Sequence, residues 1–297
     1  MIIELPTKMK KENIPKITHE VFDDNLKPKS DYFEFDFSKV DFIEPGGVVA
    51  LCNLISLLKA KGVKGVLKLG KQPYNDKHKK VLNYLADSYF FIKKFDITAV
   101  REPVFSQTVL TIEEINFSKF FSWKDQRLDL WLKNNTKTRS SFTNIRTVMD
   151  EIYNNIKDHS TEDVGCVFGQ FYPNKNEIIL CISDFGIGIP ASLRNLYPDL
   201  TDSQLLEKSL EEGITTQTTP RNRGAGLHTI INSATKNRVG EVYIMSNYGI
   251  IEVVNEKVVS SKDTNKFYPG TFFEIKIDIT NPNLYESETK EDFEWSF

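Results

Sequence analysis

Residues 177–190 read EIILCISDFGIGIP, and this stretch decides how we interpret the second half of the chain. An apolar run that ends in Asp184 and two closely spaced glycines predicts a buried strand followed by a tight turn. Residues 164–172 are a second strand candidate, and residues 173–176, PNKN, are a turn by composition. The two runs therefore predict an antiparallel hairpin that carries Asp184 at its end.

Asp184 stands where a strand gives way to a Gly-x-Gly turn. A carboxylate in this position can accept a hydrogen bond from an exocyclic amine such as that of adenine. Gly186 and Gly188 permit positive φ and a close approach of a ligand to the backbone. By itself the pattern also fits a simple strand-to-helix connection. Residues 184–186 spell DFG, but the chain has neither the HRD loop nor the VAIK strand of protein kinases, and no P-loop motif.

Residues 148–159, VMDEIYNNIKDH, form a second stretch with chemical potential. Helical spacing places Glu151, Asn155 and Asp158 on one face, roughly opposite an apolar face. An amide oxygen is a hard ligand that suits Mg²⁺, and a carboxylate one turn earlier can orient or deprotonate a nucleophile. Taken alone, the pattern also fits a solvated helical face.

Residues 213–228, GITTQTTPRNRGAGLH, are a polar loop that ends in Gly-Ala-Gly at the start of a predicted helix. Backbone N–H groups at a helix N-terminus bind phosphate, and Arg221 and Arg223 add positive charge. A Gly-Ala-Gly turn is common, so this stretch is also weak by itself.

The three stretches occur in order along the chain and are followed by residues 269–273, PGTFF. Together they resemble the GHKL superfamily, also called the Bergerat ATP-binding fold, which includes gyrase-type topoisomerases, heat-shock chaperones, histidine kinases and mismatch-repair ATPases. The resemblance covers roughly residues 125–280. It implies a two-layer α/β sandwich, of the α+β class, that binds ATP and Mg²⁺.

The resemblance also implies a role for each matching residue. Asn155 is the expected Mg²⁺ ligand, Glu151 matches the general base of hydrolysing members, and Asp184 is expected to bind the adenine amine. Residues 215–223 match the lid over ATP, and residues 224–227 the cap over the phosphates. The nucleotide-binding set implied in this way is Asn155, Asp158, Asp184, Gly186, Gly188, Thr216, Arg223, Gly224, Gly226, Leu227 and Thr271.

Three functions stay open on this basis. The first is a slow Mg-ATPase that works as a conformational regulatory switch. The second is a serine/threonine protein kinase of the anti-sigma-factor type, which would use the same site on a protein hydroxyl. The third is a non-catalytic nucleotide sensor that only binds partners. Glu151 favours the two enzymes, because many histidine kinases carry an asparagine at the matching position.

Residues 35–51, FDFSKVDFIEPGGVVAL, are similar to the STAS fold of anti-sigma-factor antagonists, over about residues 30–97. The pattern predicts strand 32–37, helix 48–61, strand 65–70 and helix 81–95, a small α/β unit with βαβ connections. The turn predicted at residues 44–47 lacks the hydroxyl that is often phosphorylated in this family. The resemblance suggests an internal or dimeric contact that controls access to the ATP site.

Composition bounds the remaining possibilities. The chain has 297 residues, a net charge of −3 and three cysteines without a CxxC pair. These values predict a two-domain protein of the reduced cytoplasm, without a disulfide framework, a structural zinc site or direct nucleic-acid binding. No apolar run approaches the ~18 residues of a membrane span. We expect the chain to bind ATP or ADP. We also expect it to associate with a protein partner or to form a homodimer.

The predicted organisation has four parts. They are a STAS-like domain at 1–97, a connector at 98–124, a GHKL domain at 125–280 and an acidic tail at 281–297. The tail closes with Phe293-Glu294-Trp295-Ser296-Phe297 and fits either a partly ordered terminus or a peptide that docks on a partner.

Overall fold

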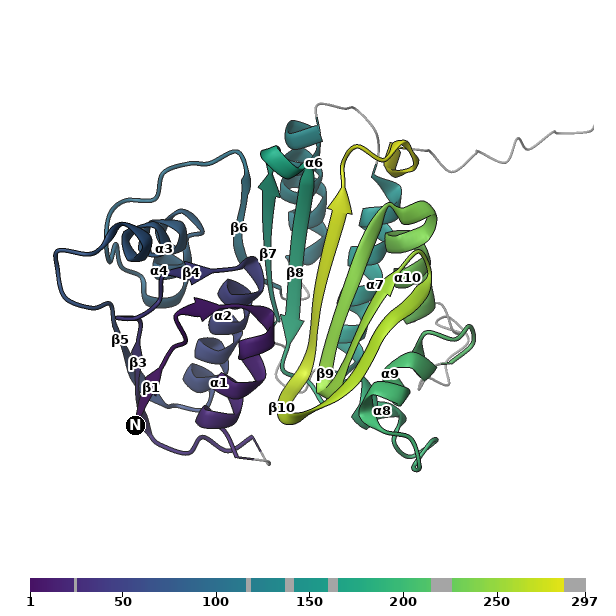
Figure 1. Ribbon diagram of the computed structural model, residues 1–297, viewed down its shortest axis with the longest axis horizontal. Coiled ribbons are helices and arrows are strands. Elements are labelled where there is room, and N and C mark those ends of the chain that lie inside the picture. The colour runs from purple at the N-terminus through teal and green to yellow at the C-terminus, as the bar shows by residue number, and fades with distance from the viewer. Residues whose placement is uncertain (24–25, 116–118, 137–141, 160–164, 215–225, 286–297) are drawn as a thin grey trace, which may run out of the picture.

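Two main sheets organise the chain in the computed structural model (Figure 1). The structure describes residues 1–23, 26–115, 119–136, 142–159, 165–214 and 226–285. Both units combine helices with strands, so the mixed α/β class predicted from the sequence is confirmed at this level. No helix in the described part of the chain is long and apolar enough to cross a membrane.

The first unit is built on a parallel sheet of order β1-β3-β5, with a short parallel pair of β2 and β4 beside it. Its elements, in chain order, are β1 (Ile2–Glu4), β2 (Lys8–Met9), η1 (Lys11–Asn13), α1 (Ile14–Val21), β3 (Tyr32–Asp36), β4 (Phe42–Ile43), α2 (Pro45–Ala60), β5 (Lys64–Lys68), α3 (Asp76–Asp87) and α4 (Phe90–Phe95). Helix α2 connects β3 to β5, as the predicted βαβ unit requires.

The segment before residue 30 contains a helix that the sequence analysis did not predict. In α1, Ile14, Ile17 and Val21 are buried at helical spacing. Apolar residues at i, i+3 and i+7 with polar residues between them are an amphipathic pattern, which the sequence analysis overlooked.

Two further local predictions in this unit were wrong. Residues 44–47 are not a turn, because α2 begins at Pro45. Proline is tolerated there, since the first N–H groups of a helix have no partner within the helix. The helix predicted at 81–95 is divided in two, because Tyr89 adopts a φ of 65° between α3 and α4.

The second unit is an antiparallel sheet of order β6-β7-β8-β10-β9. Its elements are β6 (Val109–Ile115), α5 (Phe120–Trp123), a π-helical turn (Lys124–Leu128), α6 (Asp129–Thr136), α7 (Thr143–His159), β7 (Gly165–Tyr172), η3 (Pro173–Lys175), β8 (Glu177–Asp184), α8 (Ile189–Leu193), α9 (Asp202–Ser209), α10 (Gly226–Thr235), η5 (Lys236–Arg238), β9 (Gly240–Val254), β10 (Lys257–Asp278) and η6 (Pro282–Tyr285). The predicted β7–β8 hairpin is confirmed.

The C-terminal strands differ from the prediction. Apolar runs in the sequence predict three strands here, at 241–246, 250–255 and 270–279. In the structure the first two are one strand, β9, and β10 starts at Lys257 rather than Gly270. Residues 257–268 are largely polar, so apolar alternation could not reveal that they pair with β9. The segment 98–124, expected as a connector with one strand candidate at 104–112, supplies β6 as an edge strand of this sheet.

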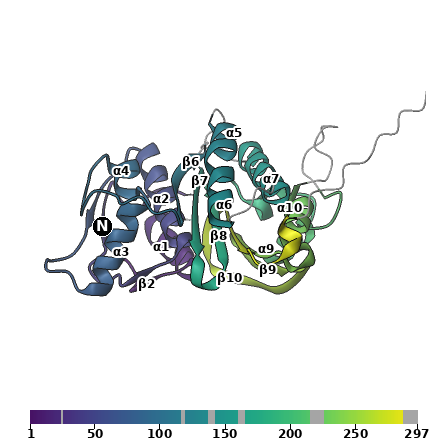
Figure 2. The ribbon, with the colours of Figure 1, turned by 90° about the horizontal axis from the view of Figure 1, so that it is seen from above.

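Side chains alternate between the two faces of the second sheet. Along β8, Ile178, Leu180 and Ile182 belong to the core that includes α7 and α10. The intervening Cys181 belongs to the core shared with the first unit. Helices α1 and α2 pack on this second face, against β7, β8 and β10. Figure 2 shows the sheet standing between α1 and α2 on one side and α7 and α10 on the other.

An internal contact between the two units is therefore present, on the face of the sheet away from α7 and α10. Lys11 Nζ lies 2.6 Å from the Glu274 carboxylate of β10, and 4.3 Å from the centre of the Tyr243 ring. Both charged side chains are largely buried, so this ion pair fastens the first unit to the sheet.

Candidate functional site

Asp184 lies at the end of β8 and is only 5% exposed. Its carboxylate accepts hydrogen bonds from the backbone N–H groups of Gly186 (2.6 Å) and Thr271 (3.2 Å). Burial raises the pKa of Asp184 to about 7, although these N–H groups act in the opposite direction. Asp184 is thus a buried carboxyl that changes its protonation near neutral pH, which is a property typical of functional sites.

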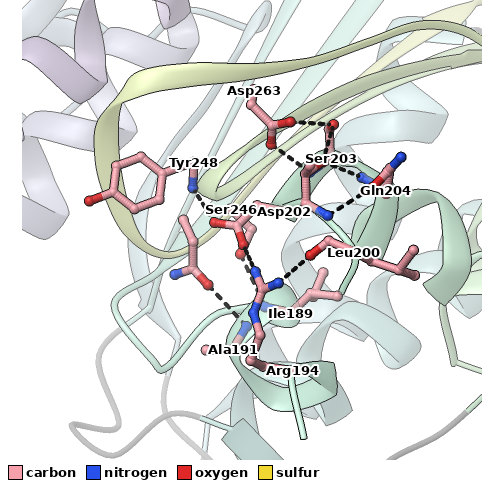
Figure 3. A network of polar contacts seen from close by, with 12 residues as sticks. Ile189, Ala191, Arg194, Leu200, Asp202, Ser203, Gln204, Ser246, Tyr248 and Asp263 are labelled. Carbon is pink, nitrogen blue, oxygen red and sulfur yellow. Dashed lines mark hydrogen bonds and ion pairs between the residues drawn. The ribbon is translucent and has the colours of Figure 1, made fainter. Parts of the chain in front are cut away.

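The glycine turn after Asp184 is held in place by β9. Ser246 Oγ accepts the N–H of Ile189 at 3.0 Å, and Asn247 Oδ1 accepts the N–H of Ala191 at 3.1 Å (Figure 3). Gly188 has a φ of +84°, and a Cβ there would lie 2.5 Å from Asn247 Nδ2. Only glycine therefore fits at this position. Sequence reasoning missed Ser246 and Asn247, because the turn that they hold lies far from them in the sequence.

Thr271 closes the same corner from β10. Its Oγ1 lies 3.1 Å from Ser246 Oγ, which also donates to the C=O of Gly270 at 2.6 Å. Thr271 is as deeply buried as Asp184, with 5% of its surface exposed. The structure therefore brings Asp184, Thr271 and the glycine turn together at one corner of the sheet, although Thr271 is distant in sequence.

Asn155 and Gly226 meet where α7 packs against α10. A Cβ on Gly226 would lie 3.6 Å from Asn155 Oδ1. Asn155 Nδ2 is buried and has no hydrogen-bond partner among the described residues. An unpaired buried amide costs about 1–3 kcal/mol, so this side chain has unused binding capacity close to the start of α10.

Glu151 lies one helical turn before Asn155 on α7 and is half-buried. Burial raises the pKa of its carboxyl, and the charge of the neighbouring Asp150 acts in the same direction. A raised pKa makes a carboxylate a stronger base, which is what proton abstraction from water or a hydroxyl needs.

The residues present fit a Mg²⁺ ion that arrives with phosphate groups. Across the described ranges, no group of three or more His, Cys, Asp and Glu side chains is placed to hold a metal by itself. Mg²⁺ in nucleotide sites keeps several waters and takes few protein ligands beside the substrate phosphates. The amide oxygen Oδ1 of Asn155, which faces Gly226 at the start of α10, is the kind of ligand that suits such a site.

Part of the expected site lies outside the described residues. This applies to Thr216, Arg223 and Gly224, and to the side chain of Asp158. Leu227 is described: it lies in the first turn of α10, partly buried against the core of the second unit.

A second polar network fixes the segment that follows the glycine turn (Figure 3). Arg194 donates to the carboxylate of Asp202 and to the C=O of Leu200. The other carboxylate oxygen of Asp202 accepts the N–H of Tyr248 at 2.9 Å. In addition, the Asp263 carboxylate of β10 accepts the backbone N–H of Ser203 at 2.9 Å. This network, which the sequence analysis did not find, ties α8 and α9 to the β9–β10 hairpin.

No protein-family description matches this chain, and no curated protein is significantly similar to it.

Proposed function

We propose that this protein binds Mg-ATP in a GHKL-type site and hydrolyses it slowly, as a conformational switch. The observation that carries the proposal is the meeting of Asn155 with Gly226 on the side of the sheet to which Asp184 also points. Helices α7 and α10, which are far apart in the sequence, thus meet on the face of the sheet toward which Asp184 points. Polar helix faces that serve only to contact solvent would not need to meet in this way.

The position of Asp184 on that side follows from the alternation of side chains along β8. Every second residue from Ile178 to Ile182 belongs to the core that includes α7 and α10, and Asp184 is the next residue in this series. Since successive side chains of a strand point to opposite faces, Asp184 points to the side on which Asn155 and Gly226 meet.

The adenine end of the proposed site is the corner formed by Asp184, Thr271 and the glycine turn. The ionised carboxylate of Asp184 would accept a hydrogen bond from the adenine amine, and its cost of burial would then be offset by a specific partner. Gly186 presents no side chain, so a flat ring can approach the backbone closely there. At Gly188 the space of a side chain is taken by Ser246 and Asn247, which fix the turn.

The phosphate end is the junction of α7 and α10. Asn155 would hold Mg²⁺, which supplies charge neutralisation at the phosphates when it is bound. Backbone N–H groups at the start of α10 would bind phosphate oxygens. Glu151, with its raised pKa, would take a proton from the attacking water.

The first unit, which we propose to be STAS-like, would respond to nucleotide binding from the opposite face of the sheet. Ser183 precedes Asp184 and points to the opposite face, where its hydroxyl contacts that of Tyr268. Asn53 of α2 is fully buried beside the same tyrosine. A shift of Asp184 on nucleotide binding would thus be transmitted through its neighbour in the strand to α2.

The test is to incubate the full chain with γ-labelled ATP and Mg²⁺ and to follow the label. Glu151→Gln should lose release of free phosphate but keep ATP affinity. Glu207→Gln, which changes an exposed glutamate on α9, is the matched control and should behave as wild type. Label retained on this or another protein would replace the ATPase by the kinase. Binding without any transfer would leave the nucleotide sensor, and absence of binding would refute the proposal.

A further inference from the structure

Strand β5 is an edge of the first sheet, and its outer side has no neighbouring strand in the described part of the chain. Lys64 donates its N–H to the C=O of Asp31, and the C=O of Lys68 accepts the N–H of Phe37, so both lysines direct their backbone toward β3. In a parallel ladder the alternate residues, Gly65 and Leu67, direct theirs to the other side. These groups can therefore pair with an added strand.

An apolar pocket of about 450 Å³ lies beside this free edge. Its lining includes Ile55 and Leu58 of α2, Phe95 of α4, and Gly65 and Leu67 of β5. A cavity of about 150 Å³ accommodates one benzene ring, so this pocket has room for about three aromatic rings. Side chains of an added strand that face inward, beside Gly65 and Leu67, would enter it.

The other face of the same edge carries one lysine without an ion-pair partner among the described residues. Lys64 is exposed, and no carboxylate in the described part of the chain forms an ion pair with it, whereas Lys68 pairs with Glu34 and Asp36. The surface therefore favours an extended peptide with aromatic residues on one side and an acidic residue on the other.

Residues 293–297, FEWSF, have this pattern. In an extended conformation Phe293, Trp295 and Phe297 would point to one side, and Glu294 to the other. We propose that segment 293–297 of a second copy of this chain adds to β5 as a strand. Its three rings fill the pocket, and Glu294 lies within reach of Lys64. This is strand addition to an exposed edge, in which the backbone gives affinity and the pocket gives specificity.

The donor is a second copy because the segment of the same chain is too short to reach. Tyr285 packs against Phe142 just before α7, with 6.0 Å between ring centres. From the α7 layer to the first sheet, the path crosses the second sheet and α2 (Figure 2), roughly three layer spacings of about 10 Å. The eight steps from Tyr285 to Phe293 span at most about 29 Å. The chain cannot pass through the packed layers and would have to run around them, which makes the required path longer still.

The test uses a variant that keeps composition and breaks the alternation, Glu294→Trp combined with Trp295→Glu. Sedimentation over a range of concentrations should show self-association of the wild-type chain and a monomeric variant. A labelled peptide of residues 286–297 should bind the full-length variant, and the same peptide with the two residues exchanged should bind at least about tenfold more weakly. The amides of Gly65 and Leu67 should gain hydrogen-exchange protection when the wild-type peptide binds.

A substitution on the receiving side checks the charge. Lys64→Glu should weaken binding of the wild-type peptide several-fold, and Lys257→Glu, which changes an exposed lysine of the β9–β10 hairpin, should leave it unchanged. Three results would overturn the proposal. They are equal binding of the two peptides, absence of binding, and protection of the β5 amides in a wild-type chain that stays monomeric, which would mean that the segment docks within its own chain.

Discussion

A Cβ atom on Gly270 would lie 2.7 Å from Oδ1 of Asp184, closer than real Cβ atoms approach another heavy atom. Gly270 also adopts a φ of +71°. At Gly270, just before β10 begins to pair with β8, the backbone can therefore pass Asp184 only because glycine has no side chain. This close passage lets Thr271 donate its N–H to the buried carboxylate.

Gly270→Ala should destabilise the protein by more than about 2 kcal/mol, because the added methyl group meets Asp184 and the φ is unfavourable. Gly62→Ala is the matched control: Gly62 has the same φ of +71°, but a Cβ there meets nothing within 4 Å. It should cost only about 1 kcal/mol. Urea unfolding measures both, and equal losses would show that contact with Asp184 is unimportant.

The raised pKa of Asp184 predicts a dependence of stability on pH. Its pKa is about 7 in the folded chain and near 3.8 when exposed. Its contribution to the free energy of unfolding is therefore full below about pH 4 and is lost as the pH rises through about 7. The stability of wild type relative to Asp184→Asn should fall by a few kcal/mol between pH 4 and pH 8. A relative stability that stays constant or grows, in unfolding experiments at both pH values, would contradict the assignment.

Asn155→Ala should change stability and ligand binding in opposite directions. Its Nδ2 is buried without a partner among the described residues, so its removal should stabilise the protein by about 1 kcal/mol while it weakens Mg-ATP binding. Asn135→Ala on α6 is the control, because Asn135 Nδ2 donates to the C=O groups of Gln107 and Trp131, both at 2.9 Å. That change should destabilise by about 1–3 kcal/mol and leave binding intact. Calorimetric melting and titration would show the contrast.

Lys11→Ala should loosen the junction between the two units. It leaves the largely buried Glu274 without its partner, at a cost of about 2–3 kcal/mol. Lys39→Ala removes an exposed ion pair with Glu4 and should cost well under about 1 kcal/mol. Denaturant unfolding compares the two, and similar costs would argue against a structural role for the Lys11–Glu274 pair.

The sequence was most informative where apolar periodicity and glycine chemistry agree. The β7–β8 hairpin and the βαβ order around α2 follow from alternation and turn residues alone. The likeness to GHKL and STAS proteins stays a prediction. The convergence of Asn155 with Gly226 lends it support, because no property of either segment alone requires that contact.

The elements that sequence reasoning missed are those stabilised by partners distant in the chain. Helix α1 is an exception, since the helical spacing of Ile14, Ile17 and Val21 is legible in the sequence itself. The first half of β10 is polar and pairs with β9 through backbone hydrogen bonds, which leave no trace in the side-chain pattern. Ser246 and Asn247 act on a turn about sixty residues earlier, so no local pattern marks their role.

The measurement that tests the central claim most directly is calorimetric titration of ATP, with Mg²⁺, into wild type and Asp184→Asn. We expect wild type to bind ATP and to prefer it to GTP, which has no exocyclic amine in the matching position of the base. Asp184→Asn should lose at least about tenfold in ATP affinity, because the buried acceptor for that amine is replaced by a group that also donates. Equal affinity of the two proteins for ATP, or no binding by wild type, would contradict the assignment of this corner as an adenine pocket.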